Sequence, residues 1–167
     1  MQTIHLITTG GTIEKGYSEQ LGKVLNDANK IAQYLNLLRL PDCDVRVIPV
    51  MNKDSLEMSA DDRAQLVAEV GRLLRERCPI VITHGTDTMV ESGLAIEKAF
   101  PAPQIPVVLT GAMTPLGFER SDALQNLTES LFAARLLAPG VYIVMHGQVF
   151  AAARVRKDRE RATFVAT

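Results

Sequence analysis

The sequence predicts an α/β fold, a three-layer sandwich in which helices flank a mostly parallel β-sheet. Five short apolar runs recur along the chain, and segments with helical periodicity lie between them. Three of the runs are nearly unbroken and largely β-branched, as is typical of parallel strands that are covered on both faces. Alternation of strand and helix favours a parallel sheet with helical layers. The predicted strands are residues 4–7, 45–50, 80–82, 107–109 and 141–145.

Three predicted helices fill gaps between these strands. The second is expected to begin after Ser59, whose hydroxyl can cap it, with Asp62 three residues further on. The third is expected to start near Ser121 and Asp122 and to stop before Pro139, because proline cannot continue a helix. The apolar residues that share a helical face are Ala28, Ile31, Ala32, Leu35 and Leu38 in the first helix, Leu66, Val70, Leu73 and Leu74 in the second, and Leu124, Leu127 and Leu131 in the third.

Length and composition restrict the class of protein. A chain of 167 residues suits one domain, residues 1–167, and leaves no room for a second full domain. The 18 basic and 19 acidic side chains give a net charge of −1, which argues against nucleic acid as a partner. No apolar stretch approaches the roughly 18 residues of a membrane span, and the N-terminus lacks a secretory signal, so we expect a cytoplasmic protein without a membrane partner. Cys43 and Cys78 lie far apart and are expected to be buried free thiols.

A glycine-rich turn follows the first predicted strand. Gly10 and Gly11 permit backbone conformations with positive φ and allow a ligand to approach main-chain N–H groups. Thr12 would then place a hydroxyl at the end of the strand, where ligands bind in such folds. The turn alone does not separate a nucleophile from an ordinary strand exit.

A second polar segment, residues 83–88, follows the predicted strand at 80–82. It brings hydroxyls, an imidazole and a carboxylate to another carboxyl end of the sheet. An alternative interpretation is that Asp87 or Thr88 caps the helix that follows. His84, taken alone, is interpreted as a structural hydrogen-bonding residue, because nothing else in the sequence assigns it a proton-transfer role.

Taken together and in order, these segments resemble the bacterial-type asparaginase family, and the resemblance extends from Thr8 to Phe164. Several motifs in the right order are much harder to obtain by chance than one. The resemblance implies the fold of the N-terminal asparaginase domain. The matching segments are Thr-Gly-Gly-Thr-Ile at 9–13, Lys-Asp-Ser-Leu-Glu-Met at 53–58, His-Gly-Thr-Asp-Thr at 84–88, Val-Leu-Thr-Gly-Ala-Met at 108–113, Ser-Asp-Ala-Leu-Gln-Asn-Leu at 121–127 and Arg-Val-Arg-Lys at 154–157.

The resemblance also implies catalytic roles. Thr12 matches the threonine that attacks the amide carbon, and Tyr17 matches the tyrosine of a mobile loop that assists it. Thr86, Asp87 and Lys157 match a second triad that relays protons. Without the resemblance, the many charges around Lys157 would favour a solvated segment.

For substrate binding, the resemblance implies that Ser55 and Asp87 hold the α-carboxylate and the α-amino group of the amino acid. Gly11, Gly85 and Ala112 are expected to line the same site, and no metal or organic cofactor is expected. Two positions depart from the family pattern. Leu56 stands where a polar residue often helps to hold the amine, and Glu14 stands where a small residue is usual, beside the hinge of the Tyr17 loop.

The function implied by the resemblance is hydrolysis of L-asparagine to L-aspartate and ammonia through a threonine acyl-enzyme, with glutamine a poorer substrate. Full-size members have a second domain, so the sequence resembles a short, single-domain form, expected as a homo-oligomer, a dimer or a tetramer. An alternative of another class is an amino-acid-binding domain that has lost turnover. A nucleotide-binding domain is disfavoured, because the phosphate-loop and dinucleotide-binding glycine spacings are absent around Gly10 and Gly11.

Overall fold

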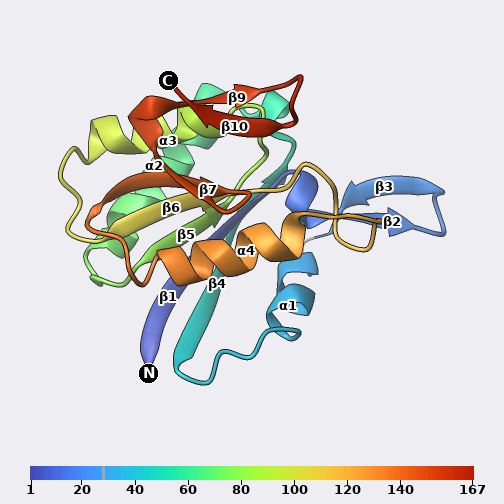
Figure 1. Ribbon diagram of the computed structural model, residues 1–167, viewed down its shortest axis with the longest axis horizontal. Helices are drawn as coiled ribbons and strands as arrows, with labels where there is room; N and C mark the ends of the chain where they lie inside the picture. Colours follow the sequence, from blue (N-terminus) through green and yellow to red (C-terminus); the bar gives the residue numbers. More distant parts are fainter. Residues whose placement is uncertain (28) are drawn as a thin grey trace.

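The computed structural model describes residues 1–27 and 29–167 and has the predicted α/β sandwich (Figure 1). Its main sheet has six strands in the order β4-β1-β5-β6-β7-β8. The first five strands in this order are parallel, and all five predicted strands are among them. The sixth strand returns antiparallel at the edge. The strands are β1 (Gln2–Gly10), β4 (Cys43–Lys53), β5 (Ile80–Thr83), β6 (Pro106–Thr110), β7 (Gly140–Met145) and β8 (Gln148–Ala151).

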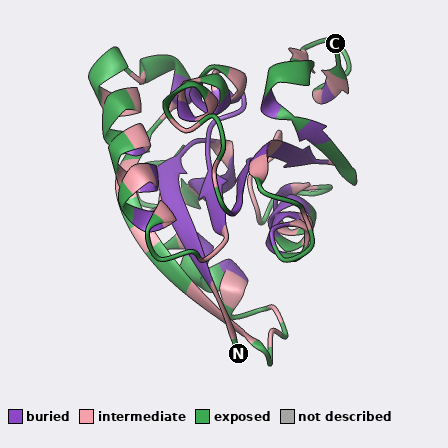
Figure 2. Ribbon diagram, turned by 90° about the vertical axis from the view of Figure 1, so that its left-hand side faces the viewer, coloured by how far each residue is buried: buried purple, intermediate pink, exposed green. Residues whose placement is uncertain are grey.

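Two apolar layers cover the two faces of the sheet. Every residue of β5 and β6 is buried, which explains the unbroken apolar runs in these segments (Figure 2). Helices α2 (Ala60–Leu74) and α3 (Met89–Ala99) pack on one face, and α1 (Lys30–Leu35) and α4 (Ala123–Ala133) pack on the other. The predicted three-layer sandwich is therefore confirmed.

The helix boundaries agree in part with the predictions. The N-terminus of α2 forms a capping box, in which Ser59 Oγ accepts from the Asp62 amide at 3.2 Å and the Asp62 carboxylate accepts from the Ser59 amide at 2.8 Å. Helix α4 starts directly after Asp122. Helix α1 is shorter than the apolar face predicted for it. Leu38 lies beyond the end of the helix, and Ala28 falls outside the described residues. In the part of the chain that is described, no helix combines the length and apolar character needed to cross a membrane.

Two small hairpins, not predicted from the sequence, stand apart from the main sheet (Figure 1). One, formed by β2 (Lys15–Ser18) and β3 (Lys23–Asn26), projects from the body of the molecule. The other, formed by β9 (Val155–Asp158) and β10 (Thr163–Ala166), has Val155 and Phe164 in the apolar core. Each hairpin carries one residue of the predicted site.

The two cysteines are free thiols, but the expectation that they are buried is wrong. Both are partly exposed. Cys43 begins the edge strand β4, and Cys78 lies in the loop before β5. Neither position is covered on all sides, because an edge strand and a loop each leave one side open to solvent.

Candidate active site

Four loops leave the carboxyl ends of neighbouring parallel strands and meet at one edge of the sheet. Strand β1 continues into the 3₁₀ turn η1 (Thr12–Glu14), and β4 continues through Asp54 into the 3₁₀ turn η2 (Ser55–Glu57). Strand β5 leads through residues 84–88 to α3, and β6 leads through Gly111 towards α4. Because these strands are adjacent in the order β4-β1-β5-β6, their exits converge.

Gly11, Gly85 and Ser55 are in direct contact across three of these loops. A Cβ added to Gly11, where φ is +82°, would lie 2.5 Å from the backbone of Gly85, and one added to Gly85 would lie 2.5 Å from Ser55 Oγ. Ser55 is 1% exposed, and its hydroxyl has no hydrogen-bond partner among residues 1–27 and 29–167. A buried hydroxyl without a partner is costly, so Ser55 Oγ is a donor available to a ligand.

A charged group, which we call the Lys157 cluster, consists of Lys157, Thr86, Asp87 and Arg159. Lys157 Nζ, from β9, donates to Thr86 Oγ1 at 2.7 Å and to Asp87 Oδ1 at 3.0 Å. Arg159 binds the same oxygen of Asp87 at 2.8 Å. The side chain of Lys157 is only 16% exposed, whereas that of Arg159 is 68% exposed. The interpretation as a solvated charged segment therefore fits Arg159 and does not fit Lys157.

The remaining predicted site residues lie around these two groups. Thr12 is partly exposed at the start of η1, directly after Gly11. Tyr17 is 61% exposed on the projecting hairpin, and none of the described hydrogen bonds joins it to Thr12. Ala112 is fully buried in the core cluster under α4, where its side chain packs in the fold.

Residues 3–165 match the family model described as "Asparaginase, N-terminal". The chain belongs to the asparaginase family. It is 34% identical to the L-asparaginase of Thermococcus kodakarensis over 152 residues, which cover 91% of this chain and 46% of that protein. It is also 32% identical over 146 residues to a glutamyl-tRNA(Gln) amidotransferase subunit from Archaeoglobus fulgidus, covering 86% of this chain and 34% of that protein.

Solved structures of the family have the same fold. The thermostable L-asparaginase from Thermococcus kodakarensis superposes with a TM-score of 0.88 at 31% identity, covering 99% of this chain and 51% of that one. A probable cytoplasmic L-asparaginase from Campylobacter jejuni superposes with a TM-score of 0.76 at 26% identity, covering 99% of this chain and 52% of that one. The chain thus spans about half of the length of these relatives.

His84 and Thr88 have structural roles in this member of the asparaginase family. The ring of His84 is fully buried between Gly85 O at 2.7 Å and Ser92 Oγ at 2.8 Å. Burial lowers the pKa of His84 to about 4, so the ring is neutral at neutral pH. Thr88 occupies the N-cap position of α3, yet its hydroxyl donates to Ser55 O at 2.9 Å and does not cap the helix.

Glu14 is a buried carboxyl group beside the site. From the sequence it is notable only as a departure from the family pattern. It is 1% exposed, and its Oε1 accepts from the Gly10 amide at 3.0 Å and from Thr83 Oγ1 at 2.7 Å. Glu14 therefore joins the exit of β1 to the end of β5. Its backbone oxygen also accepts from the Asp27 amide at 2.7 Å, just after β3. Burial raises the pKa of Glu14, against the lowering effect of the Thr83, Gly10 and Thr9 donors.

Glu14→Gln is expected to change how stability depends on pH. Because the pKa of Glu14 is raised above its ordinary 4.5, the folded protein loses stability as pH rises from that value through the folded-state pKa. Glutamine retains an acceptor oxygen and does not titrate. The free energy of unfolding of the variant, relative to the parent, should therefore increase as the pH rises from 4.5 through the folded-state pKa of Glu14 in urea titrations. A constant difference over this range would contradict the raised pKa.

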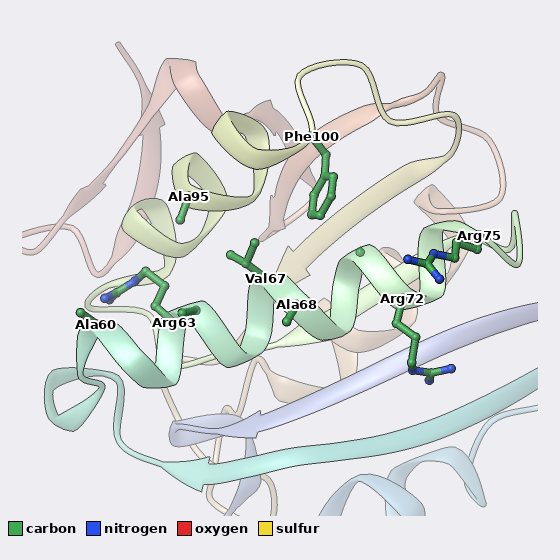
Figure 3. Close-up of a pocket in the computed structure, with 10 residues that line it drawn as sticks. Ala60, Arg63, Val67, Ala68, Arg72, Arg75, Ala95 and Phe100 are labelled. Carbon is green, nitrogen blue, oxygen red and sulfur yellow. The ribbon is translucent and has the colours of Figure 1, made fainter.

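A separate hollow of about 720 Å³ lies on the outer surface between α2 and α3 (Figure 3). Its floor is largely apolar, with Val67, Ala68 and Phe100 among its lining residues, and Arg63 and Arg72 also line it. None of the predicted site residues is among these lining residues. The predicted site residues therefore lie outside this hollow.

Proposed function

We propose that this chain hydrolyses the side-chain amide of L-asparagine to give L-aspartate and ammonia, with Thr12 as the nucleophile. The observation that carries the proposal is the Lys157 cluster beside the contact of Gly11, Gly85 and Ser55. Apart from Arg159, both groups consist of residues to which the family resemblance assigns roles, and they come from four separate segments of the chain. Such convergence of a partly buried lysine, a hydroxyl and a carboxylate suits acyl transfer.

In the proposed reaction, Thr12 Oγ1 attacks the amide carbon, the C–N bond breaks, and the nitrogen leaves as ammonia after receiving a proton. Water then attacks the resulting ester, releasing aspartate and restoring the Thr12 hydroxyl. Thr86 Oγ1 accepts a hydrogen bond from Lys157 Nζ, so its own proton is free to be donated. Thr86 and Lys157 are therefore the proposed path for protons during the two steps. No step requires a metal or an organic cofactor.

The proposed substrate site has opposite partners for the two ends of the amino acid. The Asp87 carboxylate, partly exposed and next to Arg159, attracts the α-ammonium group. Ser55 Oγ, which lacks a partner in the described part of the chain, donates to the α-carboxylate. Leu56 is 67% exposed beside Ser55 and offers no polar group, so we expect weaker binding of the amine here. Glutamine, which is longer, is proposed as the poorer substrate.

Two further elements complete the proposed site. Tyr17, on the projecting hairpin, assists Thr12 when the hairpin closes over the substrate. A hollow of about 540 Å³ beneath this hairpin, lined partly by Tyr17, Lys30 and Asn52, provides space for that movement. We also propose that residues 1–167 act as a single domain, in a cytoplasmic homo-oligomer, a dimer or a tetramer, in which a neighbouring subunit encloses the site.

The test is steady-state ammonia release from asparagine and from glutamine by the purified chain, together with its mass in solution. We expect saturable hydrolysis of asparagine and slower hydrolysis of glutamine. If aspartate binds by calorimetry but neither amide is hydrolysed, the chain is an amino-acid-binding domain and the proposal is wrong.

The similarity to an amidotransferase subunit supports a second candidate function. In it, the same site releases ammonia for transfer to another acceptor. Rapid hydrolysis of free asparagine by the chain alone would contradict this candidate.

A further inference from the structure

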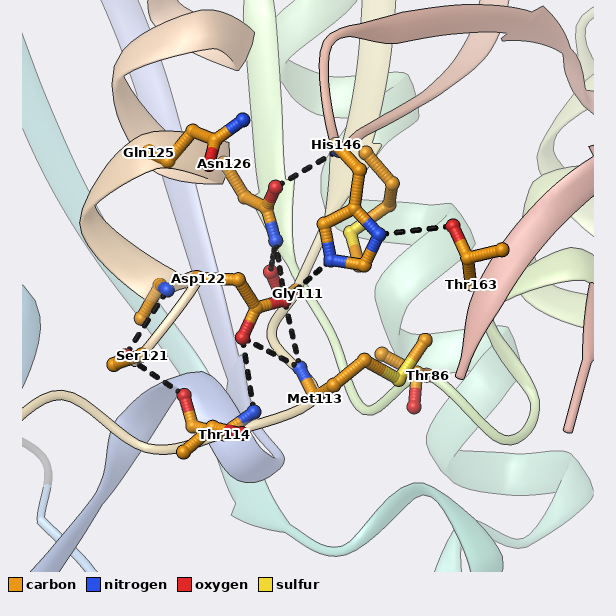
Figure 4. Close-up of polar contacts among 12 residues, drawn as sticks. Thr86, Gly111, Met113, Thr114, Ser121, Asp122, Gln125, Asn126, His146 and Thr163 are labelled. Atoms are coloured by element: carbon orange, nitrogen blue, oxygen red, sulfur yellow. Dashed lines mark hydrogen bonds and ion pairs between the residues drawn. The ribbon is translucent and has the colours of Figure 1, made fainter. Parts of the chain in front are cut away.

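His146 joins two distant parts of the molecule through its ring, in an arrangement that we call the His146 bridge and that comprises Asp122, His146 and Thr163 (Figure 4). Nε2 of the ring lies 2.7 Å from Asp122 Oδ2, and Nδ1 lies 2.9 Å from Thr163 Oγ1. Because a carboxylate only accepts, a neutral ring carries its proton on Nε2 and accepts from the Thr163 hydroxyl at Nδ1. Both polar atoms of the ring are therefore satisfied.

The backbone at His146 is held in a conformation that few residues adopt. His146 and Gly147 form the two-residue turn between β7 and β8, and their φ angles are 52° and 75°. Such turns favour asparagine or glycine at the first position, since positive φ is unfavourable for most side chains. Asn126 Oδ1 accepts from the His146 amide at 3.0 Å and helps to hold this conformation. The turn therefore points the ring between Asp122 and Thr163.

At one end of the bridge, Asp122 is rigidly fixed. Its carboxylate accepts from the Met113 amide at 3.0 Å and from the Thr114 amide at 2.9 Å, in the loop that follows β6 (Figure 4). Asn126 Nδ2 donates hydrogen bonds to Asp122 Oδ2 and to Gly111 O. Gly111 lies close to Thr86, since a Cβ added to Gly111 would be 3.3 Å from the Thr86 methyl group. Burial alone would raise the pKa of Asp122, but these amides and His146 lower it overall, so Asp122 is an anion at neutral pH.

At the other end, Thr163 begins β10 and belongs to the hairpin that carries Lys157. In this hairpin Thr163 pairs with Asp158, and the next residue, Phe164, pairs with Lys157. Among the described residues, two sets of polar side-chain contacts tie the hairpin to the rest of the molecule. One is the Lys157 cluster itself, and the other is the His146 bridge. The bridge thus fixes the hairpin one residue pair away from Lys157.

We propose that His146 is a positioning residue for Lys157. By its hydrogen bond with Thr163, His146 fixes the position of the β9–β10 hairpin so that Lys157 Nζ can donate to Thr86 Oγ1. This inference rests on the proposed function for its effect on catalysis. The predicted effect lies mainly in the chemical step, because Lys157 relays protons, while Ser55 does not contact the hairpin. Asp87, the proposed partner of the α-ammonium group, contacts the hairpin through Lys157 and Arg159, so a smaller change in KM is expected as well. Misplacement of a catalytic group by about 1 Å can lower turnover by about 10²-fold.

The test begins with His146→Gly, which suits the positive φ of the turn and removes the whole side chain. We expect kcat for asparagine to fall by about 10-fold or more, with KM changed by less than about 3-fold. Added imidazole should partly restore kcat of this variant, since the side chain of His146 is 25% exposed and its place is open to solvent. Imidazole should not affect the parent. Gln148→Ala, at an exposed position next to the same turn, is the matched control and should leave kcat unchanged.

Thr163→Val removes the other end of the bridge without changing the turn. It should lower kcat to a similar extent, and the double variant should be no worse than either single variant, since both changes break the same link. If both single variants fold like the parent and keep kcat within about 2-fold, the proposal is wrong. Additive losses would also overturn it.

A readout independent of turnover separates this inference from the proposed function. The ¹⁵Nζ resonance of Lys157, assigned with Lys157→Arg, should move in both His146→Gly and Thr163→Val and stay in place in Gln148→Ala. A parent that does not hydrolyse asparagine contradicts the proposed function alone. An unchanged Lys157 resonance in both variants contradicts the positioning role.

Discussion

Thr12→Ala is expected to lower the rate of ammonia release from asparagine by about 10³-fold or more. The proposed acyl-enzyme forms on the Thr12 hydroxyl, which this substitution removes, so the reaction loses its covalent route. The change is small in structural terms: Thr12 is partly exposed at the start of η1, between the buried residues Gly11 and Ile13. The free energy of unfolding should therefore change little, and the loss should lie in kcat.

Thr12→Ser is the matched control for this prediction. It keeps a hydroxyl on the same backbone and should retain a measurable part of the activity, because only a methyl group is lost. Calorimetry should show that Thr12→Ala still binds aspartate, since Ser55 and Asp87 are unchanged. If Thr12→Ala folds like the parent and releases ammonia at a similar rate, Thr12 is not the nucleophile.

The sheet could be predicted from sequence because its central strands are covered on both faces. In β5 and β6 every position is buried, so the strands appear as unbroken apolar runs bounded by polar loops. The two hairpins leave no such signal. Strand β9 reads Val-Arg-Lys-Asp, and three of its four residues are charged. Its position depends on Val155 and Phe164, whose burial cannot be read from the local pattern.

The site could be predicted only in part. Glycine-rich and polar segments at strand exits indicate where ligands bind, but the pairing of Gly11 with Gly85 and of Lys157 with Thr86 joins residues about 70 positions apart or more. Only the family resemblance connected them. The sequence does not predict that Glu14 is buried, because burying a carboxyl group is costly without donors, and its Thr83 donor is distant in the sequence. His146 was missed for the same reason, since Asp122 and Thr163 both reach it from other segments.

Lys157→Met is expected to lower kcat for asparagine by about 10²-fold to 10³-fold, the range typical of a lost proton-transfer group. Methionine fills a similar volume but cannot donate to Thr86, whose hydroxyl then loses the partner that orients it. Asp87 keeps its ion pair with Arg159 at 2.8 Å, so no carboxylate is left without a cation and the fold should persist.

Arg159→Met tests whether the lysine acts through Thr86 or only through charge. Arg159 binds the same Asp87 oxygen as Lys157, but its side chain is 68% exposed, and in the Lys157 cluster it is Lys157 Nζ that donates to Thr86. An exposed ion pair contributes little, so kcat should fall by less than about 3-fold in this variant. Steady-state kinetics on both variants at equal salt concentration make the comparison. Equal losses would mean that neutralising Asp87 is what matters, and Lys157 would then have no separate role in proton transfer.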